Sequence, residues 1–408
     1  MSAIALFSFV LAFANDATMQ SSDKTEPQKN SNYMECLGNA ARKAIAKGAS
    51  EAAAMASIDG LYVPDEKIIA ASRAQPESNL KIWDYLAGVV DDERATDGAK
   101  AYLSQKDFLY NLGIQYGVDP ATVVAIWGVE TDYGKVMGKS NIINALGTLG
   151  CGGGRRAAYF NSELVEAIRI TANGHVPLSQ FNGSWAGAFG HTQFMPSTFW
   201  RLAADGNGDG IKNIVGEPKD ALASTANFLK KSGWDQTQKW GYEVIVPSTY
   251  NGAIGRNAKK SLSQWKALGV KLADGNELED SEIRYGLIFP GGRNSPAFLV
   301  GRNFNAVYSY NPATSYALAV NILADRIKGG KGVIGKWSTN DPGISRAMRR
   351  EIQQILTAKG YDVGQPDGII GKKTNDALKE YYKAHNLTFN GRLGQVAYDK
   401  IKSLESGR

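Results

Sequence analysis

The stretch from Asp119 to Gly134 constrains the fold of this 408-residue chain more than any other. Asp119 is a good helix N-cap, and Pro120 suits the first helical position. Tyr133-Gly134 can end the helix. Three apolar residues and one acid recur at the i, i+3, i+4, i+7 spacing of a single helix face: Val123, Ile126, Trp127 and Glu130. The pattern predicts a core helix with a carboxyl group in its last turn.

Glu130 therefore combines two influences that disfavour a negative charge. It lies on the apolar face, where water is excluded, and at the helix end where the dipole is negative. A raised pKa follows, as a general acid near neutral pH requires. The alternative is a solvated glutamate at a helix edge. Asp132, two positions on, is expected to point away from Glu130.

Four further regions can be distinguished along the chain by their residue patterns. Residues 33–130 are predicted to be helical, and residues 242–310 mix strand-like runs with turns. A stretch rich in glycine and polar residues at 329–341 is typical of a linker, and residues 342–408 form a helical unit. The fold class is therefore mainly α, with a smaller mixed lobe and a C-terminal three-helix domain.

The N-terminus indicates export. Ile4 to Phe13 is an apolar or small run too short to span a bilayer, and Ala12-Phe13-Ala14 fits a signal-peptidase site. We expect a signal peptide at 1–14 and a flexible leader at 15–32. No lysine or arginine precedes the run, and an N-terminal core helix is the alternative. No later apolar run reaches a membrane span, so a soluble exported protein without a transmembrane anchor is expected.

Charge and cysteine content narrow the classes of partner and cofactor. The net charge is +6, but the basic residues are scattered pairs and form no stripe, which argues against nucleic acid. Two cysteines and three histidines, with no closely spaced pair, form no zinc motif. In an exported chain, Cys36 and Cys151 favour a disulfide, and two buried free thiols are the alternative.

The segment D-G-N-G-D-G (205–210) is the one candidate for a metal-binding site. It opens like a calcium loop, with Asp205, Asn207 and Asp209 at ligand spacing. The closing acid, Glu217, comes one residue late. A metal-free turn is as well supported as a structural Ca²⁺ ion, and no cofactor is required by the pattern.

Several blocks together carry a family resemblance. They are AIWGVETDYG (125–134), KSNIINALGTL (139–149), GSWAGAFGHTQFMPST (183–198), DALASTANFLKKSGW (220–234) and YNPATSYALAV (310–320). The chain from about 33 to 328 resembles the lytic murein transglycosylases of the membrane-bound lytic transglycosylase B family, glycoside hydrolase family 103. The resemblance implies a lysozyme-like catalytic domain at 33–328. It also implies non-hydrolytic cleavage of the MurNAc–GlcNAc β-1,4 bond of peptidoglycan, which leaves 1,6-anhydroMurNAc ends.

The resemblance also implies roles for individual residues. Glu130 matches the catalytic acid and base. Six residues match family positions that line the sugar subsites: Ser184, Gln193, Phe194, Tyr310, Asn311 and Tyr316. Phe228 stands where some relatives have tyrosine, and some relatives bind calcium at the position of the 205–217 loop.

Residues 342–408 resemble a peptidoglycan-binding domain. The mark is D-G-x-x-G-x-x-T, present here as Asp367 to Thr374, and any small three-helix bundle is the alternative. We expect this domain to bind the wall and to take no part in the chemistry. The whole chain is thus predicted to be a periplasmic lytic transglycosylase acting on peptidoglycan strands. A muramidase that uses water and a catalytically silent wall-binding scaffold are the alternatives.

Overall fold

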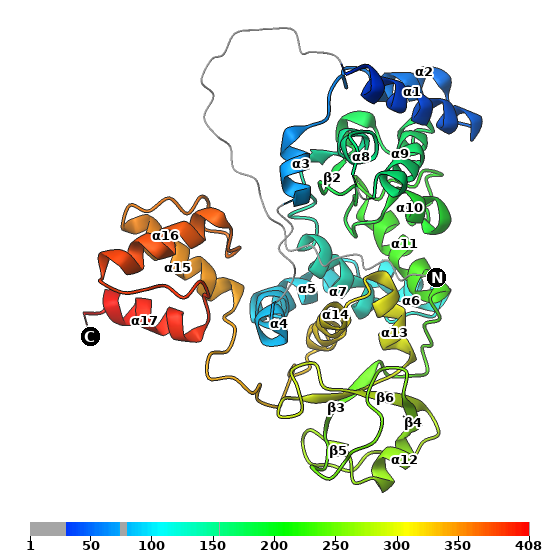
Figure 1. Cartoon of the computed structure of the whole chain (residues 1–408). Helices are drawn as coiled ribbons and strands as arrows, with labels where there is room; N and C mark the ends of the chain where they lie inside the picture. The colour runs from blue at the N-terminus through cyan, green and yellow to red at the C-terminus, as the bar shows by residue number, and fades with distance from the viewer. Residues whose placement is uncertain (1–29, 74–79, 155, 408) are drawn as a thin grey trace.

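The computed structural model describes residues 30–73, 80–154 and 156–407. The expected signal peptide and most of the expected leader lie outside these residues. Within them the chain is mainly helical (Figure 1). The helices are α1 Ser31–Ala46, α2 Glu51–Ile58, α3 Glu66–Arg73, α4 Ile82–Val89, α5 Asp92–Ser104, α6 Lys106–Tyr116, α7 Pro120–Thr131, α8 Ile142–Cys151, α9 Ala157–Ala172, α10 Pro196–Leu202, α11 Pro218–Lys231, α12 Leu262–Ala267, α13 Arg302–Tyr310, α14 Thr314–Ile327, α15 Arg346–Ala358, α16 Lys372–Ala384 and α17 Gln395–Glu405. The expected fold class is confirmed.

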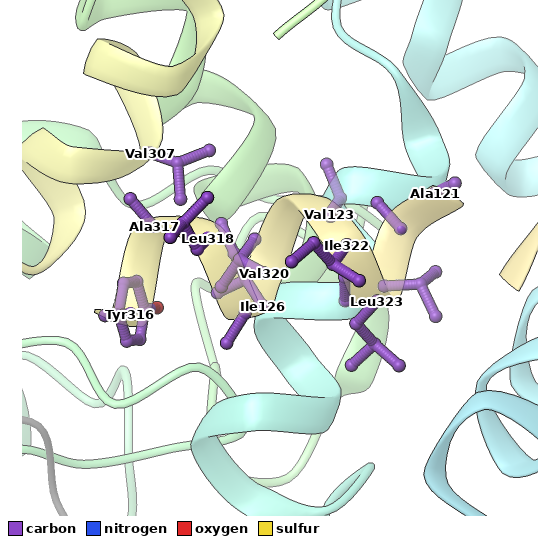
Figure 2. Close-up of a cluster of buried hydrophobic side chains, with 14 of the residues drawn as sticks. Ala121, Val123, Ile126, Val307, Tyr316, Ala317, Leu318, Val320, Ile322 and Leu323 are labelled. Atoms are coloured by element: carbon purple, nitrogen blue, oxygen red, sulfur yellow. The ribbon is translucent and has the colours of Figure 1, made fainter. Parts of the chain in front are cut away.

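Helix α7 lies at the centre of the largest hydrophobic core, packed against α14 (Figure 2). The Asp119 carboxylate accepts the Ala121 N–H at 3.2 Å, and Pro120 occupies the first turn, as the sequence predicts. The helix has no solvent face, because every residue from Ala121 to Gly128 is buried. Helices α5, α6, α11 and α14 surround it. Its C-terminal end reaches the cavity that contains Glu130.

A second core joins the N-terminal helices to α8, α9 and the loop at 181–195. Cys36 of α1 and Cys151 at the end of α8 are joined by a disulfide across 115 residues of chain. Two short strands, β1 (Ser140–Asn141) and β2 (Asn182–Gly183), pair antiparallel beside this core. They hold the glycine-rich loop after β2 close to the end of α7.

The mixed lobe is a five-stranded antiparallel sheet in the order β4-β6-β7-β3-β5. Its strands are β3 Gly241–Ile245, β4 Lys259–Ser261, β5 Lys271–Leu272, β6 Arg284–Ile288 and β7 Ala297–Val300. It has its own core around Trp265, whose indole N–H donates to the Tyr285 carbonyl at 2.9 Å. In Figure 1 the lobe lies at the bottom of the molecule, away from the disulfide.

The C-terminal unit consists of α15, α16 and α17 around a separate small core (Figure 1). The segment at 329–341, which was expected to be a linker, makes contacts with the rest of the protein. The N–H groups of Ile334 and Gly335 donate to the Glu243 carboxylate at 2.7 and 2.6 Å, and the Trp337 ring lies 6.4 Å from that of Trp83. Helix α15 contacts α4, which places the unit beside the central helices. Across the described part of the chain, no helix is long and apolar enough to cross a membrane.

Candidate active site

The C-terminal end of α7 forms a strained turn that opens into a cavity. Asp132 is the C-cap with φ 52°, and Tyr133 follows with φ 60°, both in the left-handed region. A left-handed backbone conformation is energetically unfavourable for residues other than glycine. It persists only where surrounding contacts stabilise it. The Thr131 hydroxyl donates to the His191 carbonyl at 2.6 Å and accepts the Gly134 N–H at 3.1 Å. These bonds connect the turn to the loop that follows β2, which contains His191.

Glu130 lines this cavity, which has a volume of about 340 Å³. Burial raises the pKa of Glu130 to about 7, and the hydrogen bond from Tyr316 acts in the opposite direction. The Tyr316 hydroxyl donates to Glu130 Oε1 at 2.6 Å. Burial also raises the pKa of Tyr316 well above its usual range, so the phenol keeps its proton and remains a donor. Glu130 is thus a carboxyl group suited to exchange protons near neutral pH.

Two tyrosines connect Glu130 to the glycine-rich loop. The rings of Tyr310 and Tyr316 stack at 6.4 Å with an interplanar angle of 8°. The Tyr310 hydroxyl donates to the Thr192 carbonyl at 2.6 Å, and its ring lies 4.6 Å from that of Phe228. The aromatic wall beside Glu130 is therefore built by α13 and α14, with support from α11. A phenylalanine at 228 fits this packing, and its ring makes the contact without a hydroxyl.

Three of the other predicted subsite residues, Ser184, Gln193 and Phe194, lie in the loop between β2 and α10. Ser184 is buried and its hydroxyl accepts the Ala188 N–H at 3.0 Å, so it shapes the loop. Phe194 is buried against Tyr310 and Phe228. Gln193 has φ 53°, and its amide donates to the carbonyls of Met137 and Gly190. Of the six, only Tyr316 lines the cavity that contains Glu130.

Asn311 and His191 differ in how their polar atoms are used. Asn311 is buried, and its side-chain oxygen has no hydrogen-bond partner within the described protein, so it can accept one from a ligand. The His191 Nδ1 atom accepts the Trp127 indole N–H at 3.1 Å, and burial lowers the pKa of His191 to about 4. A histidine that stays neutral and packed suits a structural role in the loop.

The cavity also has a charged wall that the sequence did not reveal. Asp132 lines it and pairs with Arg346 of α15, Oδ2 to Nη1, at 2.8 Å. Arg94 of α5 lies 3.7 Å from the other carboxylate oxygen. Asp84 lines the same cavity and pairs with Arg392. No local pattern predicts the pairs made by Arg346 and Arg392, because these residues are more than 200 positions from Asp132 and Asp84 and carry no motif.

In the predicted calcium loop, the acidic side chains accept hydrogen bonds from backbone N–H groups of the loop itself. The Asp205 carboxylate accepts the N–H groups of Gly208 and Gly210 at 2.6 and 2.7 Å, and Asp209 accepts that of Ile211 at 2.8 Å. Glu217 instead caps α11 by accepting the Lys219 N–H at 3.1 Å. The Asp220 carboxylate stabilises the loop by accepting three backbone N–H groups, those of Gly206, Asn207 and Asn213. Among the described residues, no group of three or more His, Cys, Asp and Glu side chains is arranged to hold a metal ion.

Comparisons with known families match two regions of the chain. A model of the transglycosylase SLT domain matches residues 32–325, and a model of a peptidoglycan binding domain matches residues 345–401. A curated relative, membrane-bound lytic murein transglycosylase B of Escherichia coli strain K12, is 33% identical over 268 residues. The match covers 64% of this chain and 71% of the relative.

Solved structures give the same result. SltB3 of Pseudomonas aeruginosa, in complex with NAG-anhNAM-pentapeptide, is 38% identical, with a TM-score of 0.72 over 91% of this chain and all of that chain. The E. coli lytic transglycosylase SLT35 in complex with calcium is 28% identical, with a TM-score of 0.61 over 72% of this chain and 92% of that chain. The larger coverage by SltB3 includes the C-terminal region.

Proposed function

Because the chain belongs to the transglycosylase SLT domain family and is a lysozyme-like lytic transglycosylase of the membrane-bound lytic transglycosylase B type, we propose that Glu130 alone supplies both proton transfers of the reaction. The observation that carries this proposal is the state of the acids in the cavity. Asp84 and Asp132 are each paired with an arginine, whereas Glu130 has only the neutral Tyr316 hydroxyl.

The transglycosylase reaction requires a single carboxyl group that can donate a proton and then accept one. Protonated Glu130 donates to the glycosidic oxygen as the bond to C1 of MurNAc breaks. The resulting carboxylate then takes the proton of the MurNAc C6 hydroxyl, whose oxygen attacks C1 and closes the 1,6-anhydro ring. Glu130 ends protonated, and no water is consumed. Ordinary glycosidases use a second carboxylate as base or nucleophile, and here the substrate supplies the nucleophile.

The subsite roles of the other predicted residues are proposals that rest on the family resemblance. We propose that Tyr316, which lines the cavity, contacts the sugar, and that Tyr310 supports it by stacking against its ring. Asn311 can accept a hydrogen bond from the glycan only after its buried oxygen is uncovered. Gln193 holds the loop open toward the cavity through its bonds to Met137 and Gly190. Ser184 and Phe194 act by fixing the shape of that loop. The complex of SltB3 with NAG-anhNAM-pentapeptide supports peptidoglycan as the substrate.

The Glu130→Gln variant tests the mechanism. It keeps the shape of the side chain and the hydrogen bond from Tyr316, but it cannot titrate. Loss of general acid–base catalysis costs about 10²–10⁴-fold in rate. The unmodified protein should release 1,6-anhydro muropeptides in digests of peptidoglycan, measured by mass spectrometry.

The same variant has a signature in stability. The folded-state pKa of Glu130 is raised, so its ionisation destabilises the fold progressively as pH rises from about 4.5 to about 7. Glu130→Gln should therefore be more stable than the unmodified protein at pH 8, by about 1–3 kcal/mol, and similar to it at pH 4. Near-normal turnover by Glu130→Gln, or products with reducing MurNAc ends, would contradict the mechanism.

We also propose a structural Ca²⁺ ion at the 205–217 loop, supported by the oxygen ligands of Asp205, Asn207 and Asp209 and by the calcium complex of SLT35. Binding requires Glu217 to leave its capping position or a water to replace it. Millimolar Ca²⁺ should raise the melting temperature relative to a chelator, and Asp209→Asn should abolish the rise. An equal melting temperature with and without Ca²⁺ would leave the loop as a metal-free turn.

We propose that the protein works in the periplasm, attached to the wall through its peptidoglycan-binding domain. The apolar start of the sequence and the Cys36–Cys151 disulfide both support an oxidising, exported location. Cell fractionation should place it with periplasmic proteins, and recovery in the cytoplasmic fraction alone would contradict the proposal.

A further inference from the structure

A groove separates the turn after α7 from the C-terminal unit. One wall is the segment 135–139, and the other is formed by α15 and the segment 363–374, which contains the D-G-x-x-G-x-x-T motif. We call this the interdomain groove. Its volume is about 860 Å³, larger than the cavity around Glu130. It can therefore hold a ligand of several residues.

The charge of the interdomain groove is strongly positive. Three acidic residues line it, and six cationic residues line it: Lys135, Lys139, Arg346, Arg350, Lys372 and Lys373. Two of the acids are paired with these cations, since Glu93 pairs with Arg346 and Arg350, and Asp132 pairs with Arg346. The lysines also have carboxylate partners outside the lining: Lys135 pairs with Asp97, Lys372 with Asp376 and Lys373 with Asp362. A groove lined by an excess of one sign attracts ligands of the other sign.

Two cations at this junction have no carboxylate partner among the described residues. Lys139 is exposed on the groove wall and makes no ion pair in that part of the chain. Arg349 lines the neighbouring cavity, and its guanidinium contacts only the Asp84 carbonyl, at 3.2 Å. Helix α16 adds to this field, because its first turn borders the groove and its N-cap, Gly371, provides no side-chain cap.

The interdomain groove is continuous with the cavity around Glu130. Asp132, Val136, Arg346 and Ile369 line both. A ligand whose sugar is cleaved at Glu130 can therefore extend a substituent past the Asp132–Arg346 pair into the groove. On a MurNAc unit that substituent is the peptide on the lactyl group, which carries at least its C-terminal carboxylate.

We propose that the interdomain groove binds the anionic peptide stem of the MurNAc unit at the cleavage site, and that the C-terminal domain thereby makes peptide-bearing strands the preferred substrate. The proposal rests on the lytic activity proposed above. It gives Lys139 and Lys372 a role in specificity, with no part in proton transfer. The peptide-binding surface is shared by the two domains, so neither domain alone would show the preference.

The test compares two glycan substrates of equal length, one with peptide stems and one from which an amidase has removed them. The unmodified protein should have a kcat/KM several-fold higher for the peptide-bearing chain. In the double variant Lys139→Glu/Lys372→Glu, the ratio of the two kcat/KM values should fall about 3- to 10-fold, and the preference of the unmodified protein should weaken as salt is raised. Lys139→Arg should keep the ratio.

A matched control is Lys230→Glu/Lys231→Glu, an exposed lysine pair on α11 away from the groove, which makes the same change in net charge. An unchanged ratio in the groove variant, or an equal fall in the control, overturns the proposal. Equal loss on both substrates means that the groove carries the glycan itself and also overturns it. Absence of anhydro products from either chain would instead contradict the lytic mechanism.

Discussion

At the residue scale, the site depends on a balance between burial and one hydrogen bond. Burial favours the protonated form of Glu130, and the Tyr316 hydroxyl favours the carboxylate. The pKa of about 7 that results lets one group serve as acid and then as base. An arginine paired with Glu130 would lower its pKa, and the cavity residues Arg346 and Arg392 pair instead with Asp132 and Asp84.

Tyr316→Phe should shift this balance in a known direction. Without the donor, the carboxylate loses stabilisation and the pKa of Glu130 rises above about 7, so the acid form persists to higher pH. The high-pH limb of the kcat/KM profile should move up by about one unit. Tyr310→Phe is the control, since its hydroxyl donates to the Thr192 carbonyl and not to Glu130. A limb that stays in place in Tyr316→Phe would show that the bond does not tune Glu130.

The sequence identified part of this site and missed part of it. The helix pattern indicated a raised pKa for Glu130 and left a solvated glutamate as the alternative; in the structure burial is the cause that raises the pKa. Tyr316 needed the family resemblance, since its contact with Glu130 spans 186 residues. Arg346 and Arg392 could not be found, because an ion pair between domains leaves no periodicity in either segment.

At the element scale, long helices were predictable and short strands were not. Residues 33–130, predicted to be helical, correspond to helices α1 to α7. The strand-like runs predicted within residues 242–310 correspond to β3, β6 and β7. Strands β4 and β5 were missed because two or three residues show no alternation, and their pairing with neighbours defines them. The surrounding of α7 by four helices likewise depends on tertiary packing.

The Cys36–Cys151 bond links α1 to the end of α8 within the second core. Closing a loop of 115 residues reduces the entropy of the unfolded chain, with a ceiling of about 4–5 kcal/mol. Cys36→Ala/Cys151→Ala should therefore unfold at lower denaturant, and a reductant should destabilise the unmodified protein but not the variant. Two reactive thiols in the denatured, unreduced protein would contradict the pairing.

At the scale of the whole molecule, the position of the C-terminal domain changes the expectation drawn from sequence. A separate wall-binding module would leave the turnover of soluble fragments intact when removed. In the structure, this domain instead lines the cavity around Glu130 through Ile369 and Leu393, and its Arg346 pairs with Asp132, two residues after Glu130. The C-terminal domain therefore forms part of the wall of the cavity that contains Glu130.

The double variant Arg346→Ala/Arg392→Ala removes the two guanidinium groups that join this domain to Asp132 and Asp84. The Asp132–Arg346 pair is mostly buried, and removing one partner of a buried pair costs up to about 3–5 kcal/mol. The cost here is smaller because Asp132 keeps Arg94 at 3.7 Å, and the Asp84–Arg392 pair is more exposed. The domain should detach, seen by small-angle scattering as a larger maximum dimension, while binding to sacculi persists. Turnover of soluble peptide-bearing fragments should fall several-fold.

Lys359→Ala, which removes a pair with Glu405 inside the C-terminal domain, is the control. Full turnover by a detached form would mean that the domain serves only for attachment, because its surface beside Glu130 would then contribute nothing to the substrate.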